Sequence, residues 1–420
     1  MKKSKLLGSA LLALTATFLA TNDADAASCT ALQKLQPGGV APDAGTGTPV
    51  PTVVYVTGSS AAKPLIAALA PAIFVDPLRP ATIVYLSQGS CTGASAILSG
   101  APMASNDSTN ASYWDANSAT LAAGSKIAKE ETCTLAAGTI ADIGISDVFA
   151  QTCGLGGAGL PQGVVDFQGP IQAMTFAVNK GSREQSISAE AAYLTFGLGT
   201  LAPWLDDAFL FRRNDLSGTQ QMIGAAIGVN AKRWRGIDRG NSDNIFTSLS
   251  GLIAQADADK AIGILAADYS ARPELKQLAY QPFGQRCGYL PDVRPLDKRN
   301  VRDGRYAIWG PLHLFTQVDG TGLAKHPRAR DLIAYLAGSE PPPLGVELIR
   351  TAVRQHVVPP CAMRVQRTSE MGAMSSFKPA RACGCAFDRE ATGSTTCQAC
   401  SSNAECSSGQ SCNFGFCEAQ

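Results

Sequence analysis

Two short stretches of this chain place hydroxyl groups and glycines where a strand is expected to end and a helix to begin. Residues 57–60 (TGSS) follow the apolar run 53–56, and residues 88–93 (QGSCTG) follow the apolar run 81–86. A turn that opens a helix presents free backbone N–H groups and the positive end of the helix dipole, which together favour an anion. Because a serine at such a turn is also an ordinary helix cap, the repetition is the stronger signal.

Two further stretches add charged groups to this pattern. Residues 142–147 (DIGISD) have the pattern of a strand whose end carries Asp147, and residues 212–219 (RRNDLSGT) place arginine, hydroxyls and a glycine before a helix. A guanidinium binds an oxyanion in a fork. A carboxylate beside an anion is unfavourable unless the ligand brings a proton to donate. The four stretches together therefore predict an oxyanion site.

In this order, the motifs TGSS, QGSxTG, DIGxSD and RRxDxSGT resemble those of the phosphate-binding proteins of ABC transporters, members of the type II periplasmic binding protein superfamily. RRxDxSGT is the most specific of them. The similarity covers about residues 52–360, and residues 259–264 (DKAIGI) are similar to the family's GAIGY strand. The resemblance implies two α/β lobes joined by strand crossovers at 163–174 and 275–281, with phosphate held between the lobes by hinge closure.

The resemblance also implies a role for each matched residue in binding inorganic phosphate. Asp147 would accept the proton that phosphate keeps at neutral pH, whereas sulfate has none and would be repelled. Arg213 would supply the positive charge, and Asp215 would hold it in place. The other matched residues would donate hydrogen bonds or close the anion-binding turns: Ser59, Ser60, Ser90 or Thr92, Ser217, Gly218 and Thr219.

The chain departs from the family pattern in three places. Residues 61–64 (AAKP) replace the family's threonine and aromatic residue before the helix proline, so one hydroxyl is missing and a cation is added. The segment 101–138 is longer than the family's link and would form a lid or an interaction surface. Cys91 lies inside the second anion turn, and a disulfide to Cys133 or to Cys153 is expected without a choice between them.

The N-terminal residues have the pattern of a secretion signal. Three lysines precede an apolar run at 6–20, and residues 24–26 (ADA) have the form of a cleavage site, so the mature chain would begin at Ala27. The run falls short of the roughly 20 apolar residues that span a bilayer. We therefore expect a periplasmic, secreted or cell-surface protein. Cys29 lies just past the cut, and lipid modification there is the minority alternative.

Seven of the 13 cysteines lie in residues 383–420. A zinc knuckle or a thioredoxin-like CxxC site is an alternative to disulfides, but the tail has no histidine and no βαβ pattern. Export into an oxidising compartment favours a disulfide-stapled mini-domain. The tail resembles cysteine-rich C-terminal repeats on exported proteins of myxobacteria, which implies an attachment or sorting role. Because 13 is odd, at least one thiol stays free or pairs outside the chain.

Composition and element pattern set the fold class. The 420 residues are 45% hydrophobic with a formal charge of +1, which allows a sizeable core and argues against a sequence-wide footprint for nucleic acid. Strand-like runs alternate with helix-like runs, which predicts an α/β fold. We expect a two-lobe periplasmic binding protein type II fold with these parts: signal peptide 1–26, flexible lead-in 27–51, lobe 1 at 52–168 and 275–361, lobe 2 at 169–274, linker 362–382 and cysteine-rich tail 383–420.

The predicted function is an exported substrate-binding protein that captures inorganic phosphate, or a close oxyanion, in a cleft between the lobes for an ABC importer. Its partners would be phosphate and a permease in the inner membrane, with no nucleic acid, no metal and no cofactor, and the protein would be a monomer. The alternative is a cell-surface, matrix or sensory protein that reuses the scaffold. An enzyme is not expected, because a hydrolase would need Ser59 or Ser217 to meet one of three histidines. Residues 154–159 match GxGxxG but open no helix, so no dinucleotide site is predicted.

Overall fold

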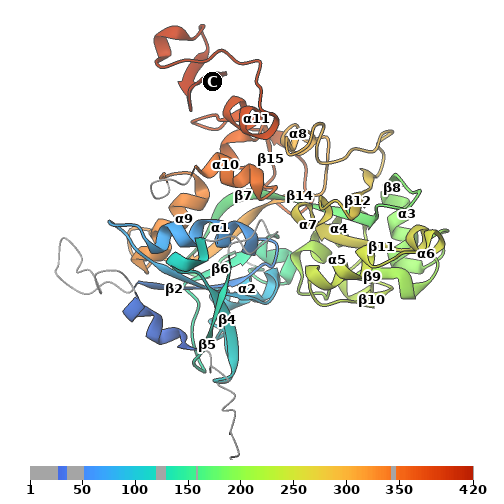
Figure 1. The fold of residues 1–420 in the computed structure, drawn as a ribbon, viewed down its shortest axis with the longest axis horizontal. Coiled ribbons are helices and arrows are strands. Elements are labelled where there is room, and N and C mark those ends of the chain that lie inside the picture. The colour runs from blue at the N-terminus through green and yellow to red at the C-terminus, as the bar shows by residue number, and fades with distance from the viewer. Residues whose placement is uncertain (1–26, 36–51, 120–128, 158, 342–346, 420) are drawn as a thin grey trace, which may run out of the picture.

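The structure is a computed structural model that describes residues 27–35, 52–119, 129–157, 159–341 and 347–419. The expected signal peptide lies outside these ranges. A 12-stranded sheet runs through both halves of the molecule (Figure 1). Its order is β1 (Ala27–Ser28), β5 (Glu131–Leu135), β4 (Thr109–Tyr113), β3 (Thr82–Ser87), β2 (Val53–Gly58), β6 (Ile143–Ser146), β14 (Trp309–Gln317), β7 (Val164–Asn179), β11 (Ile262–Ala266), β9 (Leu210–Arg212) and β10 (Ile237–Asp238), with β12 (Leu275–Gln277) also on β7.

Helices pack around the sheet, and the predicted α/β class is confirmed. In the described part of the chain they are α1 (Lys63–Phe74), α2 (Ser90–Leu98), α3 (Ala189–Tyr193), α4 (Gly218–Ile227), α5 (Ser242–Ser250), α6 (Gln255–Lys260), α7 (Ala267–Ser270), α8 (Arg299–Arg302), α9 (Pro327–Ala337), α10 (Leu348–Arg354) and α11 (Gly384–Thr392). None of these helices is long and apolar enough to span a membrane.

We call the part of the molecule around the three parallel strands β3, β2 and β6 the first half. Their apolar residues are buried on both faces, as expected for a parallel sheet between helices, and α1 packs its apolar residues against them. β2 leads into α1 and β3 leads into α2, so both helices begin at the carboxyl edge of the sheet. Gly58 has φ +132°, and a Cβ there would lie 2.0 Å from the Ile145 carbonyl oxygen. Only glycine allows β2 to turn so close to β6.

We call the part around β11, β9 and β10 the second half. These three strands are parallel to one another, and β11 is antiparallel to β7. A separate buried cluster, which includes Phe176, Phe196 and Ile264, fills this half. The strand β9 ends at Arg212, and α4 begins six residues later. The two halves therefore each bring strand ends and helix starts to the region between them.

Two long strands connect the halves. β7 pairs with β14 over Val164 to Ala173 and then with β11 from Met174 onward, which coincides with the expected crossing at 163–174. The expected return at 275–281 is wrong. β12 pairs back onto β7, and β13 (Ala279–Gln281) pairs with β8 (Ser186–Ser188), so both stay in the second half. The chain returns in β14, because the segment from 282 to 308 still belongs to the second half, where Tyr306 is buried in its core.

The insertion and the lead-in form an edge of the sheet. β4 and β5 pair with each other, β4 adds to β3, and β1 adds to β5. A disulfide joins Cys29 to Cys133. Residues 27–35 are thus tied to the sheet, which corrects the expectation of a flexible lead-in for this part. The same bond makes lipid modification of Cys29 incompatible with the structure.

The C-terminal region folds back onto the body. The expected linker 362–382 contains β15 (Val365–Gln366) paired with β16 (Ser375–Ser376), and Arg367 is only 5% exposed. Val365 and Phe377 pack against the core of the second half. The expectation of a simple linker is therefore wrong. The segment has few apolar residues and no periodic apolar face, which is why its sequence predicts a linker. It is held instead by arginine side chains and by a few apolar contacts.

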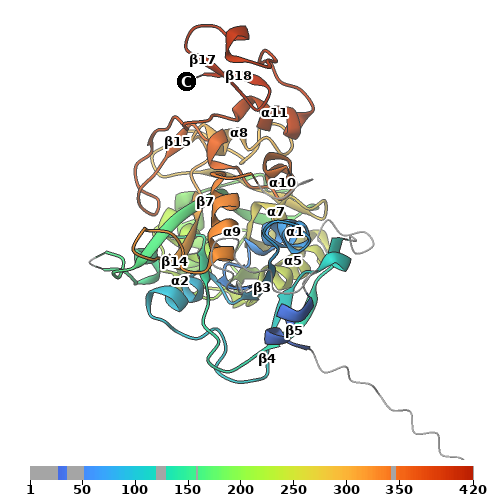
Figure 2. The same ribbon diagram turned by 90° about the vertical axis from the view of Figure 1, so that its left-hand side faces the viewer.

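Three disulfides lie within the tail, and a fourth joins the tail to Cys361 of the body. The pairs are Cys361–Cys383, Cys385–Cys397, Cys400–Cys412 and Cys406–Cys417, and the hairpin of β17 (Gln410–Asn413) and β18 (Phe416–Ala419) closes it. These pairs agree with the prediction of a disulfide-stapled tail. Cys287, in an exposed loop, is the free thiol of the described chain. Figure 2 shows the tail at the end of the molecule opposite β4 and β5.

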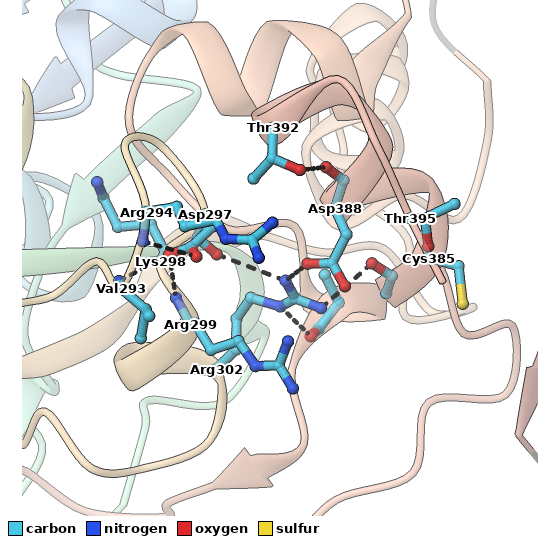
Figure 3. A network of polar contacts seen from close by, with 12 residues as sticks. Val293, Arg294, Asp297, Lys298, Arg299, Arg302, Cys385, Asp388, Thr392 and Thr395 are labelled. Atoms are coloured by element: carbon cyan, nitrogen blue, oxygen red, sulfur yellow. Dashed lines mark hydrogen bonds and ion pairs between the residues drawn. The ribbon is translucent and has the colours of Figure 1, made fainter. Parts of the chain in front are cut away.

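Figure 3 shows how the tail docks on the second half. Arg302 is 1% exposed and forms an ion pair with Asp388 of α11. Its Nε donates to the Ala362 carbonyl at 3.0 Å, and its Nη2 donates to the Gly384 carbonyl at 3.2 Å. One guanidinium thus joins α8 to both the expected linker and the tail.

Candidate functional site

The carboxyl group of Asp147 forms the centre of the candidate site. Asp147 directly follows β6 and is 2% exposed. The Ser59 hydroxyl donates to it at 2.7 Å, and the Ser90 hydroxyl donates to its Oδ2 at 2.9 Å. The Asp147 N–H in turn donates to Ser90 Oγ at 3.1 Å. Three residues from three strand ends thus meet as the motifs predicted, because parallel strands end at one edge.

The start of α4 approaches this cluster from the second half. A Cβ on Gly218 would lie 2.3 Å from Ser90 Oγ and 2.7 Å from Asp147 Oδ2, so this position requires glycine. The Cys91 N–H donates to the Leu216 carbonyl at 3.1 Å, which joins the second and fourth motifs. The first N–H groups of a helix have no partner within it, so α4 aims donors toward Asp147.

Ser217 and Thr219 flank this glycine and are each 2% exposed. The Thr219 hydroxyl donates to the Met174 sulfur at 3.4 Å, so it already has a weak partner on β7. Ser217 is the N-cap residue of α4, without a side-chain cap bond of its own. Of the two hydroxyls, that of Ser217 is therefore the freer one to meet a ligand.

Arg213 is the buried cation of the site and is 3% exposed. Its Nε donates to the Gly240 carbonyl at 3.0 Å, its Nη1 to Ser242 Oγ at 2.8 Å and its Nη2 to Ser60 Oγ at 3.2 Å. All three partners are neutral, and they use three of the five N–H donors of a guanidinium. The bond to Ser60 crosses from the second half to the first. Arg213 thus keeps two unused N–H donors, and the carboxylate of Asp147 is the charged group that attracts it most strongly.

Two predicted roles are corrected by the geometry. Asp215 does not hold Arg213: its side chain is 39% exposed and lies 3.9 Å from Lys232 Nζ. The turn from Asn214 to Ser217 directs this carboxylate outward, since Ser217 N–H donates to the Asn214 carbonyl. Thr92 is half-buried, and its hydroxyl donates to the Gln88 carbonyl at 3.2 Å within its own helix turn. Ser90 is therefore the donor that the second motif supplies.

Burial acts on both charged groups of the site. Burial raises the pKa of the Asp147 carboxyl, although the bonds from Ser59 and Ser90 and the charge of Arg213 oppose this rise. Burial lowers the pKa of Arg213, against the attraction of Asp147. The arrangement offers an acceptor, hydroxyl donors, helix N–H groups and one cation. Chemically, such a set can bind an oxyanion that carries a proton.

The disulfide Cys91–Cys153 settles which partner Cys91 takes. It ties α2, which begins with Ser90, to the short helix η3 (Ala150–Cys153) that follows Asp147. The disulfide thus holds the element that carries Ser90 close to the element that follows Asp147. The extra cation at Lys63 pairs with Glu130 of the insertion at 2.7 Å, so it is not directed at Asp147.

Sequence reasoning missed four residues near the site. Ser242 and Gly240 hold Arg213, and the Tyr85 hydroxyl donates to the Ser59 carbonyl at 2.5 Å. Burial raises the pKa of Asp268, in the first turn of α7 just after β11, to about 7, and the charge of Asp147 adds to this rise. The turn GNS at 240–242 could have been recognised as a helix start. Tyr85 and Asp268 carry no local signal, because only the fold brings them to the site.

Two of the three histidines have hydrogen-bond partners other than the candidate serines. His313 Nδ1 lies 2.7 Å from Asp166 Oδ2, and His326 Nδ1 accepts from the Ala329 N–H at the start of α9. Neither contact involves Ser59 or Ser217. Both serines lie at helix starts instead, Ser59 bound to Asp147.

Comparison with known proteins confirms the resemblance that the motifs indicated. Over 190 residues the chain is 29% identical to the phosphate-binding protein PstS of Bacillus subtilis. The match covers 44% of this chain, and the chain spans 56% of the length of that relative. No family model matches.

Solved structures with a similar arrangement include two proteins of phosphate transport. One is a Clostridium perfringens protein assigned as a phosphate ABC transporter substrate-binding protein and solved with bound phosphate, with a TM-score of 0.48, 14% identity and coverage of 73% of this chain and 99% of that one. The other is an ABC-type phosphate transport receptor from Vibrio cholerae, with a TM-score of 0.47, 12% identity and coverage of 73% and 100%.

Proposed function

We propose that this chain is an exported substrate-binding protein that captures inorganic phosphate between its two halves for an ABC importer. The observation that carries the proposal is the buried Asp147, joined by Ser59 and Ser90 and faced by Arg213 and the start of α4. The sequence relative is a phosphate-binding protein, which agrees with this chemistry. The transport partner, an inner-membrane permease, follows from the resemblance.

Asp147 gives the proposed site its selectivity. Phosphate keeps a proton near neutral pH and can donate it to a carboxylate, whereas sulfate can only accept. Sulfate at this position would face an unpaired like charge, which is an effective way to reject a competitor of the same shape. Arg213 would balance the remaining negative charge, because its three present partners are neutral.

Ligand entry requires the halves to separate. The contacts Ser60–Arg213 and Cys91–Leu216 join the halves at the site, and Gly218 packs against Ser90. β7 and β14 are the strands that continue from one half into the other, so they are the natural hinge. Phosphate would shift the equilibrium between the open and closed forms toward the closed form. The size of this shift is set by how much more tightly the closed form binds phosphate than the open form does.

Export and the tail fit this proposal. Residues 1–26 have the secretion pattern, and six disulfides form in the described chain, as expected in an oxidising compartment. The tail is fixed to the body through Arg302, so any attachment it makes would hold the body in a defined orientation.

The test is a calorimetric titration of the mature protein. Bound phosphate is first removed by unfolding in denaturant with the disulfides left oxidised, followed by refolding. Phosphate and arsenate should then bind and sulfate should give no heat. Silence for all three anions, with a folded protein by circular dichroism, would reject the phosphate-binding proposal and favour the interaction or sensory alternative.

A further inference from the structure

The C-terminal segment, defined here as residues 362–377, is anchored to the second half. The Arg364 N–H donates to the Arg302 carbonyl at 3.1 Å, and Arg364 Nη1 lies 2.7 Å from Asp303. Its strand β15 pairs with β16, and Phe377 N–H closes the loop on the Arg364 carbonyl at 2.9 Å. This segment therefore has a fixed conformation against α8.

From this anchor the segment reaches the start of the returning strand β14. The Arg367 guanidinium lies 4.2 Å from the centre of the Trp309 ring, and its Nη2 donates to the Ala307 carbonyl at 3.1 Å. The next residue of β14 is Gly310, where a Cβ would lie 3.1 Å from the Asp147 carbonyl oxygen. Arg367 thus packs on the part of β14 that supports the backbone of Asp147.

The segment also contacts the loop that follows Asp147. Glu370 Oε2 accepts a hydrogen bond from the Phe149 N–H at 3.3 Å. Phe149 lies two residues after Asp147, and its ring packs edge-on against His313 at 4.4 Å. The far end of the same loop is held by the disulfide at Cys153. Glu370 therefore restrains the loop at a point between Asp147 and the disulfide-bonded Cys153.

We propose that the C-terminal segment positions Asp147 for ligand binding, with Glu370 as the positioning residue. This inference rests on the proposed function, because it assigns to Asp147 the role of ligand acceptor. The segment belongs to neither lobe of the predicted architecture. The ligand site would then depend on a piece of chain outside the two lobes, and loss of that piece would loosen the acceptor.

The surroundings of Glu370 make this support sensitive to pH. Three charged or titratable groups act on Glu370: His313 of β14, Arg367 of its own segment and Asp147, which follows β6. His313 is in turn hydrogen-bonded to Asp166 of β7. Burial raises the pKa of Glu370 to about 7, and the charge of Asp147 adds to the rise. Loss of the Glu370 charge near neutral pH removes a like charge from the neighbourhood of Asp147, which favours ionised Asp147.

The experiment compares Glu370→Ala, Glu370→Gln and the control Thr368→Ala, a change at an exposed neighbour in the same segment. Without ligand, Glu370→Ala should speed hydrogen exchange at the Phe149 amide by about tenfold or more, and it should reduce phosphate affinity by about tenfold. Glu370→Gln keeps an acceptor oxygen and should restore both. Thr368→Ala should leave both unchanged.

The proposal fails if Glu370→Ala exchanges the Phe149 amide at the wild-type rate, or if its affinity and its phosphate-to-sulfate preference match the wild type. If Glu370→Ala does not fold, Glu370→Gln still decides. Phosphate itself titrates near neutral pH, so the two profiles are compared directly: between about pH 6 and pH 8 the affinity of Glu370→Gln should depend less on pH than that of the wild type. Identical profiles would refute the role. A wild type that binds no phosphate would reject the proposed function alone, since the exchange measurement needs no ligand.

Discussion

At the scale of residues, the site separates into groups that local pattern predicts and groups that it does not. Ser59 and Asp147 directly follow a strand, and Ser90 begins the helix that comes two residues after β3. Parallel strands bring such residues to one edge, so their meeting is predictable. Asp215 and Thr92 lie in equally good motifs but point elsewhere. The direction of a side chain in a turn depends on hydrogen-bond partners that the motif does not contain.

The contrast between Arg213 and Asp215 gives a direct prediction. Arg213→Ala should weaken phosphate binding by at least about 30-fold, since loss of a buried, hydrogen-bonded charge from a binding site costs about 2–5 kcal/mol. Asp215→Asn should change affinity by less than about threefold, as expected for an exposed carboxylate with a distant partner. Both affinities are measured by calorimetry. A large loss in Asp215→Asn would show that this carboxylate supports Arg213 after all.

At the scale of elements, the strands of the body were predictable and the return crossing was not. The runs at β2, β3 and β6 are continuous and apolar, as buried parallel strands require. The run 275–281 (LKQLAYQ) mixes polar with apolar residues, and it forms the short strands β12 and β13. Which strand returns to the first half depends on its pairing partners, so the crossing could be assigned to β14 only from the pairing.

The disulfide between α2 and η3 gives a prediction at this scale. Replacement of Cys91 and Cys153 together by serine should lower the free energy of unfolding by about 2–4 kcal/mol. It should also weaken phosphate binding, because Ser90 and Asp147 lose the clamp that holds their elements together. Denaturant unfolding and calorimetry measure the two effects.

The matched control removes a tail disulfide in the same way. Replacement of Cys400 and Cys412 by serine should lower the stability of the tail without a change in phosphate affinity, because the tail lies far from β6, the strand that Asp147 follows (Figure 1). Equal affinities in the two double variants would contradict the role of Cys91–Cys153 as a clamp of the site.

At the scale of the whole molecule, the sequence indicated separate parts and the structure joins them. The expected linker is held by Arg302, Arg364 and Arg367, and α10 meets α11 through the ion pair between Arg350 and Glu390. Such arginine contacts have no periodic signature, so composition alone suggests a loose connection. The consequence is one body in which the tail, the hinge strand β14 and the Asp147 loop are in continuous contact.

The measurement that tests the central claim most directly is the phosphate-to-sulfate preference of Asp147→Asn beside the wild type. An asparagine keeps the size of the side chain but offers an N–H donor, so sulfate is no longer repelled. The account predicts that the variant loses phosphate affinity, gains measurable sulfate binding and lowers the preference by about 100-fold or more. A preference equal to that of the wild type would contradict the claim that Asp147 reads the proton of the ligand.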